Sequence, residues 1–336
     1  MTNRERVRAV LNFEKPDDRL PAIEWASWWG ETIEAWRGQG LPTDLDWGEI
    51  APHLHLDQHH QFWFPHTAPE CPKPASHGAP IMYDEADYER IKPYLFPEHG
   101  IDAQLEQMRQ LKEGHDRGDY AIWFSMEGGF WFPRTLFGIE NHFYSFYDYP
   151  ELYHRILDDL AAYQLKAMEK IYAILTPDFM TIAEDMSYNK GSMLSEECFE
   201  EFLAPYYRKV TAFIRERGTK VIVDTDGDVS EMIPWLERVG VEGVLPLERQ
   251  AGVDLNVLRQ KHPNFLFIGG FDKMTMRQSE DAMRAEFERL LPIMKTGGYI
   301  PSVDHQTPPD VPLERYLAYV AMLKEYGEKA VKEWNR

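Results

Sequence analysis

Short apolar runs alternate with longer amphipathic segments through the second half of the chain. Each run ends in a polar cluster, and a helical repeat of apolar positions follows it. This order predicts parallel strands joined by crossover helices. The expected strands are residues 179–183, 220–223, 241–247, 265–268 and 299–303; the expected helices are 231–238, 253–261, 279–295 and 313–332, with Ser195 as the N-cap of another.

The spacing of these units favours an α/β fold of the single (β/α)₈ TIM barrel type. Each unit takes roughly 25–40 residues, as in such barrels. An open doubly wound sheet usually has a glycine-rich turn after its first strand. Here the early strand candidate, residues 20–24, leads into tryptophans instead. We therefore predict one barrel domain over residues 1–336, with an irregular excursion near 40–100.

Acidic residues recur where the expected strands end. In a parallel barrel all these ends face one side, where active sites are built. Two explanations stand side by side: each carboxylate caps the next helix or binds loop amides, or the acids converge on one reactive rim. The residues concerned are Glu24, Glu127, Glu184, Asp185, Asp224, Asp226, Glu248, Asp272 and Asp304, with His305 beside the last.

Asp224 and Asp226 are one residue apart, so both side chains share a face if the strand continues through them. Two neighbouring carboxylates repel and need a cation, an arginine or a shared proton. With His305 they make an oxygen, oxygen and nitrogen set that suits Zn²⁺ or another divalent metal. A hydrogen-bonded acid–histidine network without metal remains the alternative.

The composition excludes several other classes of protein. The 36 basic and 56 acidic residues give a formal charge of −20 over 336 residues, so nucleic acid and anionic membrane are poor partners. The two cysteines, Cys71 and Cys198, suggest no disulfide framework. The N-terminus is charged, and no window reaches the apolar length of a membrane span. We expect a cytoplasmic protein.

Several segments resemble the uroporphyrinogen decarboxylase superfamily. The opening matches at residues 3–7 and 13–17, and the likeness is weakest between about 40 and 119. The strongest segments are 184–195 (EDMSYNKGSMLS), 246–252 (PLERQAG), 269–273 (GGFDK) and 297–305 (GGYIPSVDH), with Pro308 and Pro309 following. The resemblance implies a (β/α)₈ barrel that is either a porphyrinogen decarboxylase or a methyltransferase working with corrinoid proteins or thiols.

Two departures from the family pattern separate these branches. True decarboxylases carry an Arg-Gln-Ala-Gly-Arg segment after the first strand, where this chain has EWASWWGE at 24–31. Losing those arginines argues against a polycarboxylate substrate. The thiol-activating methyltransferases bind zinc through His-x-Cys-Gly and a later Cys; here Asp224, Asp226 and His305 hold those places. Oxygen and imidazole ligands replace soft thiolates, which puts thiol activation in doubt.

Tryptophans gather near the expected rim. They suit an aromatic pocket for an aryl ether, a methylamine or a corrinoid face, or else they pack in the core and loops. The histidines at 53, 55, 59, 60 and 66 are irregularly spaced and are expected to be solvated or structural. The substrate-binding candidates are Trp25, Trp29, Glu127, Trp131, Tyr188 and Glu248.

The leading hypothesis is methyl transfer from a small methylated substrate to a corrinoid protein, with cobalamin supplied by that partner. Asp226, His305, Glu184 and Asp185 are the catalytic candidates; Asp224, Asp226 and His305 are the candidate metal ligands, with zinc as the expected ion. Decarboxylation of a smaller acid is the second hypothesis. A non-catalytic protein that binds a corrinoid or tetrapyrrole is the third.

Overall fold

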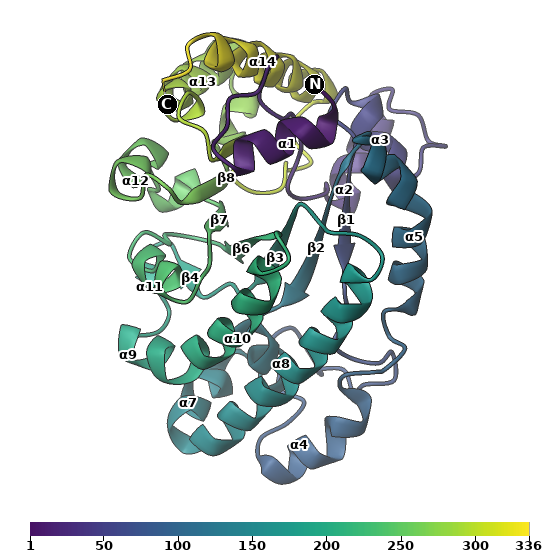
Figure 1. Cartoon of the computed structure of the whole chain (residues 1–336), viewed down its shortest axis with the longest axis vertical. Helices are drawn as coiled ribbons and strands as arrows, with labels where there is room; N and C mark the ends of the chain where they lie inside the picture. The colour runs from purple at the N-terminus through teal and green to yellow at the C-terminus, as the bar shows by residue number, and fades with distance from the viewer. Residues whose placement is uncertain (336) are drawn as a thin grey trace.

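The computed structural model describes residues 1–335, which form a curled parallel sheet of seven strands wrapped by helices (Figure 1). The sheet runs in the order β1-β2-β3-β6-β7-β8-β9, and every neighbouring pair is parallel. Its strands are β1 (His59–Trp63), β2 (Ala121–Glu127), β3 (Phe179–Ala183), β6 (Lys220–Thr225), β7 (Gly243–Pro246), β8 (Leu266–Phe271) and β9 (Tyr299–Val303). A separate hairpin pairs β4 (Ser187–Tyr188) with β5 (Gly191–Ser192).

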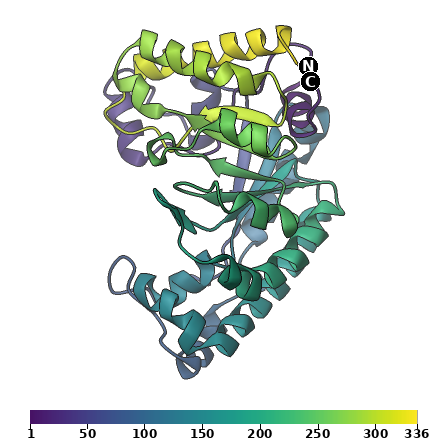
Figure 2. The same cartoon turned by 90° about the vertical axis from the view of Figure 1, so that its left-hand side faces the viewer.

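Helices cover the outer surface of the curled sheet, and the small hairpin projects from the opposite side (Figure 2). The early helices are α1 (Asn3–Leu11), α2 (Gly30–Arg37), α3 (Trp47–His53), α4 (Glu85–Ile91), α5 (Asp102–Arg117), α6 (Trp131–Phe137), α7 (Ile139–Asp148) and α8 (Pro150–Tyr172). The later ones are α9 (Glu196–Cys198), α10 (Ala204–Arg215), α11 (Ile233–Arg238), α12 (Leu255–Lys261), α13 (Glu280–Met294) and α14 (Leu313–Lys332). No helix within residues 1–335 has the length and apolar character needed to cross a membrane.

The alternation predicted for the second half of the chain is confirmed. Strands β3, β9 and helix α14 have the predicted bounds, and the other predicted elements are shifted by a few residues. The predicted N-cap is also present, because Ser195 accepts a hydrogen bond from the Cys198 amide at 3.2 Å. These elements are long apolar runs or strongly amphipathic helices, for which the sequence signal is clearest.

The prediction that residues 20–24 form the first strand is wrong. The segment is buried between the two edges of the sheet, β1 and β9, but it forms no ladder with either. On one side Asp57 N donates to Ala22 O at 2.8 Å. On the other, the Ser302 hydroxyl donates to the Glu24 carboxylate. We call this gap in the ladder the seam.

The excursion near 40–100 is less irregular than predicted. It contains α3, α4 and the edge strand β1, which pairs with β2 from His59–Ala121 to Trp63–Ser125. The strand was missed because two histidines and a glutamine interrupt its apolar pattern. His59 and His60 are therefore sheet residues, consistent with a structural role.

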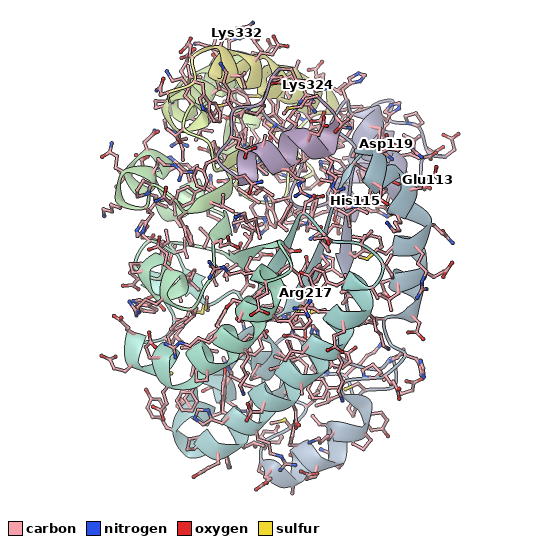
Figure 3. All side chains as sticks on the ribbon, viewed as in Figure 1. Glu113, His115, Asp119, Arg217, Lys324 and Lys332 are labelled. Carbon is pink, nitrogen blue, oxygen red and sulfur yellow. The ribbon has the colours of Figure 1, made fainter. Side chains whose placement is uncertain are left out.

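Helix α1 closes the end of the sheet where the strands begin. Gly298 N, just before β9, donates to Val10 O at 2.9 Å, and Arg4 Nε donates to Asp178, just before β3. The imidazole of His115, on α5, lies 3.0 Å from the same buried Asp178 carboxylate (Figure 3). With the amino ends covered, the opposite rim is the open one.

Candidate active site and metal-binding group

A cavity of about 230 Å³ lies at the rim where the strands end. Its walls come from loops that follow β3, β6 and β9, from strand β1, and from residues 25–27, which follow the buried segment 20–24. The residues that line it are Trp25, Ala26, Ser27, Gln61, Trp63, Asp185, Asp224, Asp226, His305 and Gln306. Three carboxylates predicted at the ends of two strands thus share one cavity, and neither lysine nor arginine is among its lining residues.

The loops after β3 and β6 are held together by short polar contacts. The Thr225 hydroxyl accepts hydrogen bonds from the amides of Met186 and Ser187 at 3.0 and 3.1 Å. Gly227 adopts φ +81°, and a Cβ on it would lie 2.3 Å from the carbonyl carbon of Tyr188. Only glycine fits both the turn and the close approach. This packing fixes Asp226 opposite Asp185.

Asp226, Glu248 and His305 form a possible metal-binding group. One ligand atom from each lies within 4.8 Å of the others. His305 Nε2 is 3.6 Å from Asp226 Oδ2, which is long for a hydrogen bond. It is close to the roughly 3.4 Å between two ligands of a tetrahedral ion with bonds near 2.1 Å. Two carboxylates and one imidazole therefore fit Zn²⁺ or a similar divalent ion.

The group differs from the predicted one in a single member. Glu248, predicted as a substrate contact, takes the place of Asp224. One Glu248 oxygen accepts a hydrogen bond from Gly227 N at 2.9 Å, which holds the side chain toward Asp226. Asp224 lies in the same cavity but outside this group. The structure therefore favours Asp226, Glu248 and His305 over the predicted set.

The remaining cavity carboxylates are kept from ionising freely. Burial, followed by the charges of Asp226 and Asp185, raises the pKa of Asp224 well above its usual value. Burial and the charge of Asp226 raise the pKa of Asp185 to about 6. Asp185 also has φ +45°, a strained value for a residue with a side chain. Such strain is often found at functional sites and is consistent with a functional carboxyl group.

His305 is framed by the two predicted tryptophans. The rings of Trp25 and Trp29 each meet the His305 ring edge-on, with centroids 6.3 Å away. Trp25 Nε1 donates to Val303 O at 2.8 Å, and Trp29 Nε1 donates to the Gln306 side chain. The Asp226 side chain raises the pKa of His305 above its usual value. Trp25 lines the cavity, whereas Trp29 is not among the lining residues and is 40% exposed.

Asp304, the neighbour of His305 in the chain, has a structural role. Its buried carboxylate accepts hydrogen bonds from the amides of Arg249 and Lys273 at 3.0 and 3.2 Å. It also pairs with the Lys273 ammonium at 3.2 Å. The loops after β7, β8 and β9 are thereby tied together, which sets the distance between Glu248 and His305.

The predicted catalytic role of Glu184 does not agree with its surroundings. Its carboxylate accepts hydrogen bonds from the amides of Gly129, Phe130 and Trp131 at 2.7–3.0 Å, and from the Tyr207 hydroxyl. These amides belong to the start of α6, so Glu184 caps that helix. All of its accepting capacity is used, and it does not line the cavity.

Of the six predicted substrate contacts only Trp25 lines the cavity; Trp29 and Glu248 border the metal-binding group, and the other three lie farther out. Glu127 is 3.7 Å from His66, and burial raises its pKa to about 7. Trp131 stacks beneath the Arg134 guanidinium at 4.9 Å, and Tyr188 is 45% exposed on the hairpin. Their side chains surround the rim without lining the space beside His305.

Gln61 and Gln306 line the cavity and were not predicted, and Trp63, one of the tryptophans expected near the rim, lines it too. Gln61 Nε2 donates to Ser125 Oγ at 2.9 Å, which holds its side chain inside the sheet. The alternation in His59-His60-Gln61-Phe62-Trp63-Phe64, with buried Phe62 and Phe64, was the available signal. Assigning that strand would have placed Gln61 and Trp63 on the inner face.

Comparisons with known proteins agree with this architecture. The family model described as uroporphyrinogen decarboxylase (URO-D) matches residues 69–326. A methyltransferase from Methanosarcina mazei superimposes with a TM-score of 0.69 at 17% identity, covering 97% of this chain and 99% of that one. A putative vitamin-B12-independent methionine synthase from Listeria monocytogenes gives a TM-score of 0.46 at 12% identity, covering 96% and 99%. No curated protein sequence matches significantly.

Proposed function

Since the chain belongs to the uroporphyrinogen decarboxylase (URO-D) family, we propose that it transfers a methyl group from a small methylated substrate to a corrinoid protein. One observation supports this choice above the others. The cavity brings together acids, a histidine and aromatic rings, with neither lysine nor arginine among its lining residues. A polycarboxylate needs such basic partners when it leaves water, so porphyrinogen decarboxylation fits this cavity poorly.

The cavity residues suit the departure of a methyl group from oxygen or nitrogen. The methyl group leaves without its bonding electrons, and the atom left behind gains charge that must be neutralised. Asp185 lines the same cavity, where its carboxyl group would give that atom a proton. Trp25 and Trp63 wall the cavity and keep water from the reacting carbon.

Asp226, Glu248 and His305 would hold a divalent ion, zinc in the first instance. Such an ion supplies Lewis acidity at the atom that loses its methyl group. Asp304 and Gly227 serve this group indirectly, because they fix the positions of His305 and Glu248. The cobalamin would be carried by the partner protein and would approach the open rim.

The proposal includes completion of the barrel. Seven ladder strands and the buried segment at residues 20–24 would fill the eight positions of a (β/α)₈ barrel. The segment would take the place of the first strand without forming a ladder; Ala22, in its middle, accepts a backbone hydrogen bond from Asp57, just before β1. A closed barrel places the candidate cavity at its carboxyl-terminal mouth.

The test is direct transfer. Purified protein, cob(I)alamin and a panel of methoxyarenes and methylamines should give the absorbance change of methylcobalamin, with about one divalent ion per chain. Asp226→Asn should abolish most transfer and lower metal content. Asp228→Asn is the matched control, since Asp228 lies in the same loop and its carboxylate accepts a hydrogen bond from Ser230 N and from no other residue within 1–335. No transfer from any donor by a folded, metal-loaded protein would refute the proposal.

A further inference from the structure

A second and larger cavity opens along the seam. Strand β1 is the edge of the sheet, and Phe64 N donates to Ser125 O at 3.1 Å. In a parallel ladder, alternate residues bond to opposite sides, so the amides of His59, Gln61 and Trp63 face away from β2. Asp57 N bonds to Ala22 O on that side, but no described residue continues this pairing beyond Asp57. No described strand pairs with this outer edge, which we call the free edge of β1, although the Gln104 side chain donates to Trp63 O at 3.5 Å.

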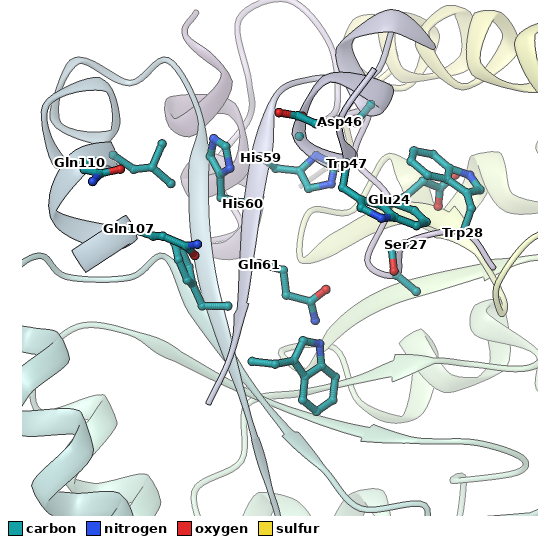
Figure 4. Close-up of a pocket in the computed structure, with 16 residues that line it drawn as sticks. Glu24, Ser27, Trp28, Asp46, Trp47, His59, His60, Gln61, Gln107 and Gln110 are labelled. Atoms are coloured by element: carbon teal, nitrogen blue, oxygen red, sulfur yellow. The ribbon is translucent and has the colours of Figure 1, made fainter. Parts of the chain in front are cut away.

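This free edge borders a cavity of about 730 Å³, the seam cavity, which straddles β1 (Figure 4). His60, Gln107 and Gln110 lie on one side of the strand, and Gln61, Ser27, Trp28 and Trp47 on the other. The remaining walls are Glu24, Ala26, Asp46, Gly48, Ala51, His59, Phe62, Trp63 and Leu111. Helices α3 and α5 form the walls on its two sides.

The polar groups offered to an occupant of the seam cavity are uncharged. Both acids are engaged: Asp46 caps α3 through Glu49 N, and Glu24 accepts hydrogen bonds from Ser302 and Tyr316. No lysine or arginine lines the cavity. The amides of Gln107 and Gln110 have no partner among residues 1–335. An anion would enter here without any compensating charge.

His60 points to a missing ligand. Its Nε2 atom is buried and has no hydrogen-bond partner among the described residues. Burial lowers the pKa of His60 to about 4, so its ring is neutral at pH 7. Trp47 and Trp63 line the same cavity and are 56% and 50% exposed, an unusual exposure for such large apolar faces. Flat rings and neutral donors together suit a ring that carries oxygen substituents.

The seam cavity adjoins the candidate active site. Ala26, Ser27, Gln61 and Trp63 line both spaces. The active-site cavity, about 230 Å³, is below the roughly 300–1,000 Å³ typical of ligand sites, while the seam cavity lies within that range. The small cavity has room for the reacting end of a donor, and the larger one for the rest.

We propose that the seam cavity binds the uncharged ring of the methyl donor, a ring bearing hydroxyl or methoxy groups, while its methyl group points toward His305. The inference rests on the proposed function and specifies its substrate class. Gln107, Gln110 and the free edge of β1 bind the ring oxygens, and Trp47 and Trp63 cover its faces. Both an aromatic ring and a methylated sugar have this chemistry, so the experiment includes one of each.

The first measurement is binding to the metal-loaded protein by calorimetry. The probes are 2-methoxyphenol, methyl glucopyranoside and the anion 4-methoxybenzoate. At least one neutral ring should bind about tenfold or more tightly than the anion. In hydrogen exchange the same ligand should slow the peptide that contains His59, Gln61 and Trp63. Equal binding of the anion, or no neutral binding, overturns the inference.

The second measurement uses a matched pair on one helix. Gln107→Trp places a large side chain in the seam cavity, whereas Ala103→Trp adds the same side chain at an exposed α5 position that does not line it. Gln107→Trp should weaken neutral-ring binding about tenfold, and Ala103→Trp should leave it unchanged. Gln110→Trp repeats the test should Gln107→Trp unfold early in urea. Identical binding by folded variants and controls overturns the inference.

The experiments distinguish a failure of the proposed seam site from a failure of the proposed methyl transfer. Neutral-ring binding that Gln107→Trp weakens, with no methyl transfer from any donor, supports the seam site and refutes the proposed function. Methyl transfer that Gln107→Trp and Ala103→Trp leave equally fast overturns the seam site and keeps the proposed function.

Discussion

Glu184 and Asp185 are neighbours in the chain, yet their carboxyl groups have opposite surroundings. Glu184 turns into the protein and meets three backbone amides and a tyrosine hydroxyl. Asp185 turns into the cavity and meets two other carboxylates and a histidine. The first arrangement stabilises a helix, and the second leaves a carboxyl group available for chemistry.

The same contrast divides the acids of the whole rim. Asp304 and Glu184 are saturated by backbone donors, whereas Asp185, Asp224 and Asp226 face the cavity. A buried acid that has enough donors is a structural element, because its hydrogen bonds are lost together if it is removed. Position at a strand end therefore does not identify a catalytic acid. The number of hydrogen-bond donors around its carboxylate is what separates the structural acids of this rim from the acids that face the cavity.

Asp185→Asn should give the largest effect, on activity alone. Methyl transfer should fall by about 10²–10⁴ in kcat/KM, the range expected for loss of a positioned proton donor. The free energy of unfolding should stay the same or rise, because a carboxyl group that resists ionisation is removed from the cavity. Steady-state transfer and urea unfolding measure the two quantities. A stable, fully active variant would place Asp185 among the structural acids.

Glu184→Ala should reverse that pattern. Three amides at the start of α6 and the Tyr207 hydroxyl lose their acceptor, at a cost of about 1–3 kcal/mol for each group left buried and unpaired. We expect unfolding at least about 3 kcal/mol easier in urea. Glu184→Gln, which keeps one acceptor oxygen, should lose less. Full stability in both variants would contradict the capping role.

Gly227→Ala tests the contact that holds the cavity loops. It combines a left-handed φ with a Cβ placed against Tyr188, whereas Gly218→Ala has φ +78° and open space around it. The control should cost about 1 kcal/mol and the site variant about 2–3 kcal/mol. Only Gly227→Ala should also slow transfer, since it displaces Asp226. Equal stabilities would show that the close approach matters little.

The smallest effect concerns pH. Burial raises the pKa of Glu184 from 4.5 to about 7. Between these values the folded chain holds more protons than the unfolded chain, so the free energy of unfolding falls as pH rises. Glu184→Gln should flatten that slope in urea titrations from pH 4.5 to 7. If the free energy of unfolding of Glu184→Gln falls with pH as steeply as before, the pH dependence comes from other acids.

The sequence predicted the parts of the fold whose pattern is local. Strands β3 and β9 are uniform apolar runs, and α14 is a long amphipathic repeat. It missed β1, whose polar residues face the cavities. It also assigned residues 20–24 to a strand, because an apolar run does not reveal that Glu24 is bonded toward β9.

The candidate site was predicted in outline but not in detail. The rim, Asp226, His305 and Asp185 follow from the positions of strand ends. The capping contacts of Glu184 were not predicted because its partners come from a loop after β2, far away in the chain. Glu248 replaced Asp224 in the metal-binding group because the Gly227 amide orients it. Long-range contacts of this kind leave no periodic mark in one sequence.

The cavity walls are assembled as two separate clamps. Thr225 locks the loops after β3 and β6, which carry Asp185 and Asp226. Asp304 locks the loops after β7, β8 and β9, which carry Glu248 and His305. The hydrogen bond from Gly227 to Glu248 joins one clamp to the other. The spacing inside each pair of side chains is therefore set by its own clamp, whereas the distance between the two pairs depends on this hydrogen bond.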